Sequence, residues 1–418
     1  MRVVIAGQGY VGLPLAVRAA EVGHEVVGYD LDTVRVGRLT RGESYVEDVP
    51  ADRLRAVLAA GSFRPSTDPG DCAGFDVAVI AVPTPLRDGV PDLSCVEASA
   101  EMIAGHLCPG TTVVLESTTY PGTTEEVVRP ILEKLSGLTA GTDFALGFSP
   151  ERIDPGNPTW NVVNTPKIVS GVDDTSLERV KAFYDTVVDT TVTVSSTREA
   201  ELAKLIENTF RHVNIALVNE IAMISNDLGI DVWQAIDAAS TKPFGFMRFT
   251  PGPGVGGHCL PVDPSYLSWR VQRALGQSFR FVDLANDINN HMPDYVVRRL
   301  NDVLNRRQRS VSGSRVLLLG LAYKKNTGDA RESPALRIVQ LLRQMGAEVR
   351  VADPHVVEAV HGAPELTMVA LTVEELRSAD AVVLLADHDE FDYDLIGREA
   401  KCLLDTRRRL QGPAVEVI

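Results

Sequence analysis

Short apolar runs alternate with helical stretches through the first part of the chain. The run R-V-V-I-A at 2–6 is typical of a parallel strand buried on both faces. A helical stretch at 13–22 follows, and then a second strand in H-E-V-V-G-Y-D, which ends at Asp30. Further apolar runs lie within 75–85, 111–122 and 143–152. The alternation predicts a doubly wound parallel α/β sheet.

The spacing of apolar residues changes after residue 196. From 197 to 231 they recur every three or four positions, which predicts one helix of about 30 residues and roughly 45 Å. Gly229 marks its end. A helix of this length usually joins domains or forms a subunit interface. A second, polar face would ordinarily meet solvent, and it carries Lys204, Asn208, Arg211 and His212.

The last part of the chain repeats the pattern of its beginning. Residues 232–310 are largely helical, with a candidate break at Pro293, and 306–314 is a polar linker. R-V-L-L-L-G-L-A-Y at 315–323 then resembles R-V-V-I-A-G-Q-G-Y at 2–10. The runs at 347–353 and 379–387 likewise match runs of the first sheet. A second, shorter α/β sheet is therefore predicted.

These patterns predict two Rossmann-like domains of doubly wound parallel sheet, joined by a long central helix and a helical domain. The N-terminal domain would span 1–196 and bind a dinucleotide. The central domain, 197–309, would be helical and mediate dimerisation. The C-terminal domain would span 310–418.

The composition is that of an ordinary globular protein. The 418 residues are 44% apolar and 23% charged. No apolar run approaches the roughly 20 residues that span a bilayer, and the N-terminus lacks a signal-peptide layout. Five scattered cysteines favour a reducing compartment and argue against disulfides or a zinc site, so we expect a cytoplasmic protein without a metal. A net charge of −15 argues against a general nucleic-acid binder.

A glycine motif follows the first strand. G-Q-G-Y-V-G places Gly7, Gly9 and Gly12 between a strand and a helix, with Asp30 about 20 residues later, as a dinucleotide fingerprint requires. Gly7 would allow the turn, Gly9 the approach of the pyrophosphate and Gly12 the packing of the helix. Asp30 would bind the adenosine ribose and favour NAD over NADP, although Arg35 weakens this preference. A glycine turn without a nucleotide is the alternative.

Ligands of doubly wound sheets bind beyond the carboxyl ends of the strands. Several residues become site candidates by this position, although each has a turn-forming or surface role as its alternative. They are Val82, Thr84, Ser117, Thr118 and Glu151.

A second glycine-rich stretch, P-G-P-G-V-G-G-H-C-L-P-V-D-P, spans 251–264. Its glycines allow the backbone to lie close to a ligand. We expect a helix to begin there, with Asp263 as its cap and Pro264 as its first residue. Cys259 would then lie near unpaired N–H groups that lower the pKa of its thiol, and it could serve as a nucleophile. The alternative is a small buried cysteine beside a plain helix cap.

The C-terminal sheet lacks the second and third glycines of the fingerprint. It carries Tyr323, Lys324, Lys325 and Arg331 in their place, so this domain could hold a different, anionic ligand.

Together these parts resemble the UDP-glucose/GDP-mannose dehydrogenase family, the nucleotide-sugar 6-dehydrogenases, over essentially the whole chain. The motifs in the N-terminal part are G-Q-G-Y-V-G-L-P-L-A at 7–16, S-T-T-Y-P-G-T-T at 117–124 and F-S-P-E-R at 148–152. Those that follow are E-L-A-K-L-I-E-N at 201–208, G-V-G-G-H-C-L-P-V-D-P at 254–264 and K-K-N-T-G-D-A-R-E-S-P at 324–334. A set of this kind in one order is highly specific.

Within the family, G-G-H-C-x-P-V-D-P and K-P-F-G-F-M resemble the branch that acts on UDP-N-acetylhexosamines, especially UDP-N-acetylglucosamine. The UDP-glucose branch typically has serine where His258 stands. It also has a second glutamate where this chain has Pro155, so a two-glutamate mechanism is not carried over. UDP-glucose, or another nucleotide glucose, is the alternative substrate.

The resemblance implies a four-electron oxidation of the primary alcohol at the sugar six-position to a carboxylate, with two NAD reduced in turn. Cys259 would attack the aldehyde stage to give a thiohemiacetal. Hydride transfer would then give a thioester, which water hydrolyses.

The resemblance also implies roles for other residues. Lys204 and Asn208 would stabilise the oxyanion, and Asp263 would position or activate water. Glu151 would be a general base, acting through Thr118 and a water. The implied cofactor contacts are Gly7, Gly9, Tyr10, Val11, Gly12, Asp30, Arg35, Val82, Thr84, Ser117, Thr118 and Arg331. The implied substrate contacts are Glu151, Arg152, Lys204, Asn208, Arg211, Phe249, Gly256 and Lys324. The central helix would form a homodimer interface.

Two other classes of protein remain open. A two-electron dehydrogenase of the hydroxyisobutyrate or phosphogluconate type would not require Cys259. A non-catalytic nucleotide-sugar-binding homologue is the other, and the intact set of Lys204, Asn208, Cys259 and Asp263 argues against it. The sequence leaves open which sugar is used, and whether the pathway makes a surface polysaccharide or a glycosylated natural product.

Overall fold

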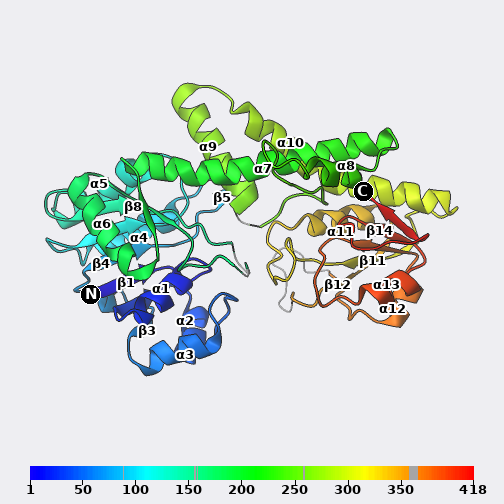
Figure 1. The fold of residues 1–418 in the computed structure, drawn as a ribbon. Coiled ribbons are helices and arrows are strands. Elements are labelled where there is room, and N and C mark those ends of the chain that lie inside the picture. Colours follow the sequence, from blue (N-terminus) through cyan, green and yellow to red (C-terminus); the bar gives the residue numbers. More distant parts are fainter. Residues whose placement is uncertain (88, 155–156, 158, 258, 357–365) are drawn as a thin grey trace. The chain divides into compact units, whose positions relative to one another are not determined.

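The computed structural model describes residues 1–418 except 88, 155–156, 158, 258 and 357–365 (Figure 1). The chain forms two compact units. The first comprises Met1–Glu207 and Trp269–Gly276, and the second comprises Asn208–Ser268 and Gln277–Ile418.

The first unit is built on an eight-stranded sheet in the order β10-β9-β8-β7-β4-β1-β2-β3. Neighbouring strands are parallel except β8 and β9, which are antiparallel. The order reverses between β1 and β4, which is where doubly wound sheets bind their ligands. The strands are β1 Arg2–Ala6, β2 Glu25–Tyr29, β3 Phe63–Ser66, β4 Val77–Ile80, β7 Thr112–Leu115, β8 Ala145–Phe148, β9 Lys167–Gly171 and β10 Thr191–Thr193, with a separate hairpin of β5 Leu86–Arg87 and β6 Val90–Pro91.

Helices cover both faces of this sheet, because alternate strand residues point to opposite sides. Val3 and Ile5 share a core with α1, α3 and α6, whereas Val4 and Ala6 share one with α4 and α5. The helices are α1 Gly12–Glu21, α2 Thr33–Thr40, α3 Ala51–Ala59, α4 Ser94–Ala104, α5 Arg129–Ser136 and α6 Asp174–Val187, with short turns at Pro69–Cys72 and Thr124–Val128.

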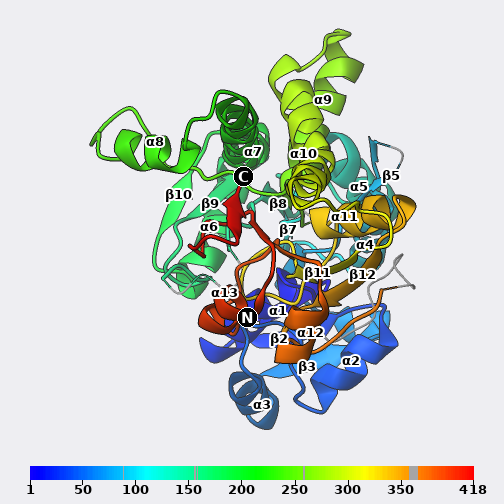
Figure 2. The same cartoon turned by 90° about the vertical axis from the view of Figure 1, so that its right-hand side faces the viewer.

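The second unit contains a five-stranded, wholly parallel sheet in the order β12-β11-β13-β14-β15. Figure 2 labels its strands β11 and β12. Val316 and Leu318 pack with α11 and with α10, Arg280–Arg306, and Leu317 and Leu319 pack with α12 and α13 on the other face. The predicted second α/β sheet is thus confirmed. Its elements are β11 Arg315–Leu319, α11 Pro334–Gln344, β12 Glu348–Ala352, α12 Val373–Ser378, β13 Ala381–Leu384, α13 Tyr393–Glu399, β14 Leu403–Asp405 and β15 Val415–Val417.

In the described part of the chain, four helices lie between the two sheets in sequence, and they differ from the expected helices in three respects. They are α7 Thr197–Asp227, α8 Val232–Ala239, α9 Cys259–Leu275 and α10 Arg280–Arg306. The long helix α7 therefore ends at Asp227 rather than at 231. Among the described residues, no helix is both long and apolar enough to cross a membrane.

The two remaining differences concern proline. Helix α9 begins at Cys259, so Asp263 is not its cap and Pro264 lies inside it, near the N-terminal end. Helix α10 runs through Pro293 without the expected break. A proline inside a helix costs one backbone hydrogen bond, but Met292, Tyr295 and Val296 around Pro293 are fully buried. Tertiary packing thus outweighs local propensity at this position.

Candidate active site

The glycines of the first loop differ in what requires them. Gly7 has a φ of 93°, and a Cβ there would lie 2.5 Å from the carbonyl oxygen of Ala81. A Cβ on Gly12 would lie 1.8 Å from the oxygen of Gly7. A Cβ on Gly9 would meet no described protein atom within 4 Å. Packing therefore requires Gly7 and Gly12, whereas the space beside Gly9 fits a phosphate approaching the N-terminus of α1.

Asp30 follows β2 and is almost fully buried. Its Oδ2 accepts hydrogen bonds from the amide of Gln8 at 2.8 Å and from Nη1 of Arg35 at 2.9 Å, and its Oδ1 accepts one from the amide of Asp32 at 2.9 Å. A carboxylate offers about four acceptor positions, so capacity for a ribose hydroxyl remains. The residues of this loop thus fit NAD. The positive charge of Arg35 is partly neutralised by its ion pair with Asp30.

The ends of β4 and β7 are tied together by two hydroxyl groups. Ser117 Oγ donates to the carbonyl of Val82 at 2.8 Å, and Thr84 Oγ1 donates to the carbonyl of Thr118 at 2.8 Å. The structure therefore brings together the four candidates that the sequence placed at these strand ends. They lie at the edge of the sheet where the strand order reverses between β1 and β4.

Glu151 lies beyond β8 in a buried cluster of charged groups. The Nζ of Lys167, at the start of β9, forms an ion pair with Oε1 of Glu116 and lies 3.7 Å from Oε2 of Glu151. Tyr184 donates from its hydroxyl to Oε2 of Glu116 at 3.2 Å. Burial raises the pKa of Glu151, and the amide of Ile153 and the charge of Lys204 oppose this rise. A buried carboxyl that is poised in this way is suited to proton transfer.

Lys204 lies on α7 and is 7% exposed. Arg152 donates to the carbonyl of Pro166 at 2.6 Å and forms an ion pair of 2.6 Å with Glu207, one helical turn beyond Lys204. Arg152 thus connects the loop after β8 to α7, within one helical turn of the candidate residue Lys204.

Asn208 and Asp263 meet inside the second unit. Nδ2 of Asn208 donates to Oδ2 of Asp263 at 2.5 Å, and Asp263 is 2% exposed. Cys259 is the first residue of α9, one helical turn before Asp263. His258 and the side chain of Cys259 lie outside the part of the chain that is described, as does Pro155. Arg211, the next polar residue of the predicted face, is exposed.

The glycine-rich loop packs against the C-terminal domain of the same unit. A Cβ on Gly256 would lie 2.7 Å from Cβ of Tyr323, and one on Gly257 would lie 2.7 Å from its ring. The amide of Gly257 donates to the carbonyl of Arg331 at 3.0 Å. Close packing thus accounts for both glycines. Lys324 is partly buried beside this contact, and the guanidinium of Arg331 pairs with Asp329 at 2.6 Å.

Phe249 precedes this loop and packs edge-on against Phe210 of α7, with ring centroids 5.9 Å apart. Of the substrate contacts that the resemblance implies, Phe249, Gly256 and Lys324 therefore all belong to the second unit.

A buried amide network also holds the loop and was missed from the sequence. Asn219 on α7 accepts at Oδ1 from the amide of Gly252 at 3.0 Å and donates to Oδ1 of Asn289 at 3.0 Å. Asn289 in turn donates to the carbonyl of His212 at 3.3 Å. His212 is 2% exposed, so the prediction that the polar face of α7 meets solvent is wrong at this residue. His212 and Asn219 lie seven positions apart on α7. Polar residues at this spacing on a long helix are the sequence signal that could have indicated buried partners.

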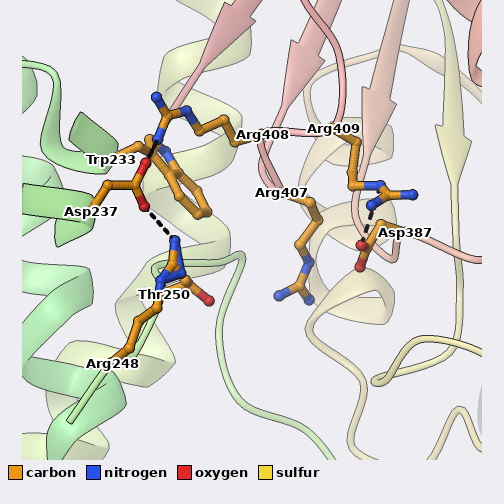
Figure 3. Close-up of a pocket in the computed structure, with 8 residues that line it drawn as sticks. All are labelled: Trp233, Asp237, Arg248, Thr250, Asp387, Arg407, Arg408 and Arg409. Atoms are coloured by element: carbon orange, nitrogen blue, oxygen red, sulfur yellow. Dashed lines mark hydrogen bonds and ion pairs between the residues drawn. The ribbon is translucent and has the colours of Figure 1, made fainter. Parts of the chain in front are cut away.

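A pocket rich in arginine was also missed (Figure 3). It has a volume of about 470 Å³ and is lined by Trp233, Asp237, Arg248, Thr250, Asp387, Arg407, Arg408 and Arg409. Asp237 pairs with Arg248 at 2.7 Å and with Arg408 at 2.8 Å. Arg407 donates from Nε to the carbonyl of Leu385 at 2.7 Å, and a Cβ on Gly252 would lie 2.8 Å from its Nη1.

Guanidinium groups gathered in this way are suited to phosphate oxygens. The sequence signal was the run of three arginines at 407–409, which begins two residues after β14 ends at Asp405.

Three domain models of one family match the chain in order. The NAD binding domain of the UDP-glucose/GDP-mannose dehydrogenase family matches residues 1–188, its central domain 198–291 and its UDP binding domain 317–412. The motifs quoted from the sequence thus led to the correct family, and the expected use of NAD is confirmed.

Known proteins resemble the chain over nearly its whole length. The UDP-N-acetyl-D-mannosamine dehydrogenase of Pyrococcus horikoshii is 36% identical over 100% of this chain and 98% of its own length. The UDP-N-acetyl-D-glucosamine 6-dehydrogenase of Pseudomonas aeruginosa is 38% identical over 94% of this chain and 91% of its own length. The solved structure of the Pyrococcus horikoshii enzyme superposes with a TM-score of 0.90 at 34% identity, covering 100% of this chain and 99% of that one. The chain therefore belongs to the UDP-glucose/GDP-mannose dehydrogenase family and is an NAD-dependent nucleotide-sugar dehydrogenase.

Proposed function

We propose that the protein oxidises the six-position of a UDP-N-acetylhexosamine from alcohol to carboxylate through a covalent thioester on Cys259. The observation that carries this proposal is the bond between Asn208 and the buried Asp263 in the first turns of the helix that begins with Cys259. A nucleophile at a helix N-terminus lies near unpaired N–H groups, which favour the thiolate.

The first unit carries all of the proposed cofactor contacts except Arg331. The loop that Gly7 and Gly12 shape would hold the pyrophosphate of NAD beside Gly9, and Asp30 would hold its adenosine ribose. When bound, NAD supplies the hydride acceptor for both oxidation stages. The hydrogen bonds that the Thr84 and Ser117 hydroxyl groups donate keep the ends of β4 and β7 in one conformation.

Protein groups carry the remaining steps. Glu151 accepts the proton of the sugar hydroxyl through Thr118 and a water. The Cys259 thiolate adds to the carbonyl carbon of the aldehyde, and its oxygen becomes an oxyanion that Lys204 and Asn208 stabilise. After oxidation to the thioester, Asp263 orients a water that attacks the acyl carbon. The carbon–sulfur bond then breaks, and the thiolate returns as the acid leaves.

The proposed sugar rests on three supports. The motif K-P-F-G-F-M at 242–247 and the tail L-P-V-D-P at 260–264 resemble the N-acetylhexosamine branch, and two relatives with names of that branch align over nearly their whole length. An acetamido group adds one acceptor and one donor to the sugar, and Arg211 would donate to its carbonyl. A site built for that group leaves a polar partner unpaired with UDP-glucose, which costs roughly tenfold to more than a hundredfold in selectivity.

The substrate is tested by kcat/KM for UDP-N-acetylglucosamine, UDP-N-acetylmannosamine, UDP-glucose and dTDP-glucose, assayed side by side. One of the two N-acetylated sugars is expected to lead by about tenfold or more. A glucose nucleotide that leads by that margin would reject the proposed sugar and leave the reaction class standing.

The protein is further proposed to act as a homodimer built on α7. Phe210, Leu217, Ile221 and Ile224 recur along one face of this helix and are 48%, 51%, 41% and 52% exposed. An apolar row of this length is unusual on a monomer surface, and a second copy of the same helix would cover it.

A further inference from the structure

The start of β9 lies at the functional edge of the sheet because β9 runs against its neighbour. The antiparallel register pairs Gly147 with Gly171 and Phe148 with Ser170. Continued past the end of β8, the same register sets Lys167 opposite Glu151. In a sheet with a parallel strand at this position, the first residue of the strand would lie at the far edge. The antiparallel direction of β9 thus places Lys167 at the edge of the sheet where doubly wound sheets bind their ligands.

Lys167 is shared between two carboxylates from two strands. Its Nζ forms an ion pair with Glu116, which follows β7, and lies 3.7 Å from Oε2 of Glu151, which follows β8. Lys167 is 6% exposed and Glu116 is fully buried. Tyr184 from α6 donates to the second oxygen of Glu116 at 3.2 Å, and the Lys167 ammonium lies 5.3 Å from the centroid of the Tyr184 ring. Lys167 is therefore held from one side and presents its charge to Glu151 on the other.

From this geometry we infer that Lys167 is a positioning residue for Glu151, which keeps the Glu151 carboxylate ionised and fixed so that it can accept a proton. The inference rests on the proposed role of Glu151 as general base. Glu116 and Tyr184 act at one remove, because they fix the Lys167 side chain.

Lys167 acts on the Glu151 carboxylate together with other nearby charges. Lys204 from α7 also favours the carboxylate, whereas Asp48 from the loop before α3 disfavours it. The amide of Ile153 donates to Oε1 of Glu151 and leaves Oε2 facing Lys167. Burial raises the pKa of Glu151, and burial together with the charge of Lys204 lowers the pKa of Lys167 well below its ordinary value. Glu116 therefore stabilises the protonated form of Lys167, because a buried ammonium group needs a carboxylate partner.

The test is the pH profile of kcat/KM, which reports the general base of the free enzyme. In Lys167→Met the cation beside Glu151 is gone, so the acidic limb is expected to move up by about one pH unit, and the rate on that limb to fall about tenfold. Lys167→Arg keeps the charge and should move the limb less. Lys181→Met is the matched control, because it removes a lysine of the same unit that is 42% exposed and paired with Asp185.

Lys167→Met leaves the buried Glu116 carboxylate without its cation, which destabilises the fold, so the double variant Glu116→Gln with Lys167→Met is measured as well. The same upward shift is expected there, because the lost cation lies in contact with Glu151. Folding of each variant is checked by circular dichroism and by NAD binding. Folded variants whose acidic limb coincides with that of the wild type would overturn the inference.

Glu151→Gln separates this inference from the function on which it rests. If Glu151 is the base, that variant loses the acidic limb. An acidic limb that persists in Glu151→Gln removes the base role from Glu151, and the inference about Lys167 falls with it. A limb that is lost in Glu151→Gln but unmoved in the Lys167 variants overturns the inference alone.

Discussion

Asn208 on α7 donates a hydrogen bond of 2.5 Å to the buried carboxylate of Asp263 on α9. This bond joins the helix that carries the proposed oxyanion donors to the helix that begins with the proposed nucleophile. An amide donor also favours the charged form of a buried carboxylate, which a water-activating group requires.

Asn208→Ala should therefore lower kcat by about a hundredfold, because one oxyanion donor and the partner of Asp263 are lost together. The affinity for NAD, measured by calorimetry, should stay close to that of the wild type, because the cofactor loop lies in the other unit. Asn214→Ala is the control, since Asn214 lies on the same helix and its side chain bonds only the carbonyl of Phe210 among the contacts described. Equal kcat in the two variants would remove Asn208 from the reaction.

Asp30→Ala should reduce the preference for NAD over NADP. The charge that repels a 2′-phosphate is gone, and Arg35, now without its partner at 2.9 Å, can meet the phosphate. The measurement is the ratio of kcat/KM for the two cofactors in wild type and variant. A wild-type enzyme that uses NADP as well as NAD would contradict the role given to Asp30.

Ile221→Glu should convert the protein from dimer to monomer, because it places a charge in the centre of the exposed apolar face of α7. Leu135→Glu is the control, an equal change at a side chain that is 54% exposed on α5. Light scattering at assay concentration reports the mass of each. An active monomeric wild type would reject α7 as the subunit interface.

Much of this site was predictable from the sequence, because local patterns specify it. The first glycine loop, Asp30 and the residues at the ends of β4 and β7 follow from short motifs at strand ends. The course of α9 through Pro264 and of α10 through Pro293 was not, because buried neighbours decide whether a helix tolerates proline. Lys167 was missed for a similar reason: its partners Glu116 and Glu151 come from other strands.

The C-terminal sheet shows how the same pattern serves different purposes. Asp353 directly follows β12 as Asp30 directly follows β2, and like Asp30 it accepts amide hydrogen bonds from the loop after the first strand of its sheet. His388, fully buried, also lies 3.1 Å from Oδ2 of Asp353. The repeated sequence correctly predicted the strand, but only the three-dimensional contacts show that this aspartate is enclosed by protein groups.

Asp353→Asn should destabilise the protein in a pH-dependent way. Burial opposes the charge, but hydrogen bonds from His388 and the backbone outweigh it and lower the pKa of Asp353 from 3.8 to about 2. A lowered pKa stabilises the fold above pH 3.8, and this contribution is lost as pH falls through 2. The variant should thus be about 2 kcal/mol less stable at pH 7, and the difference should vanish toward pH 2.

Urea unfolding between pH 2 and pH 7 measures this difference. Glu374→Gln, an equal loss of charge at an exposed position of α12, should leave the stability nearly unchanged at every pH. A constant gap between Asp353→Asn and wild type across this range would show that charge is not what Asp353 contributes.

The central claim is a Cys259-dependent four-electron oxidation, and the most direct measurement is the number of NADH molecules formed per nucleotide sugar consumed. With a UDP-N-acetylhexosamine as substrate, the wild type should give two NADH and a uronic acid. Cys259→Ser should bind NAD with similar affinity but lose this turnover, because a hydroxyl supports the thioester chemistry poorly. One NADH per sugar from the wild type, or turnover by Cys259→Ser near the wild-type rate, would contradict the mechanism.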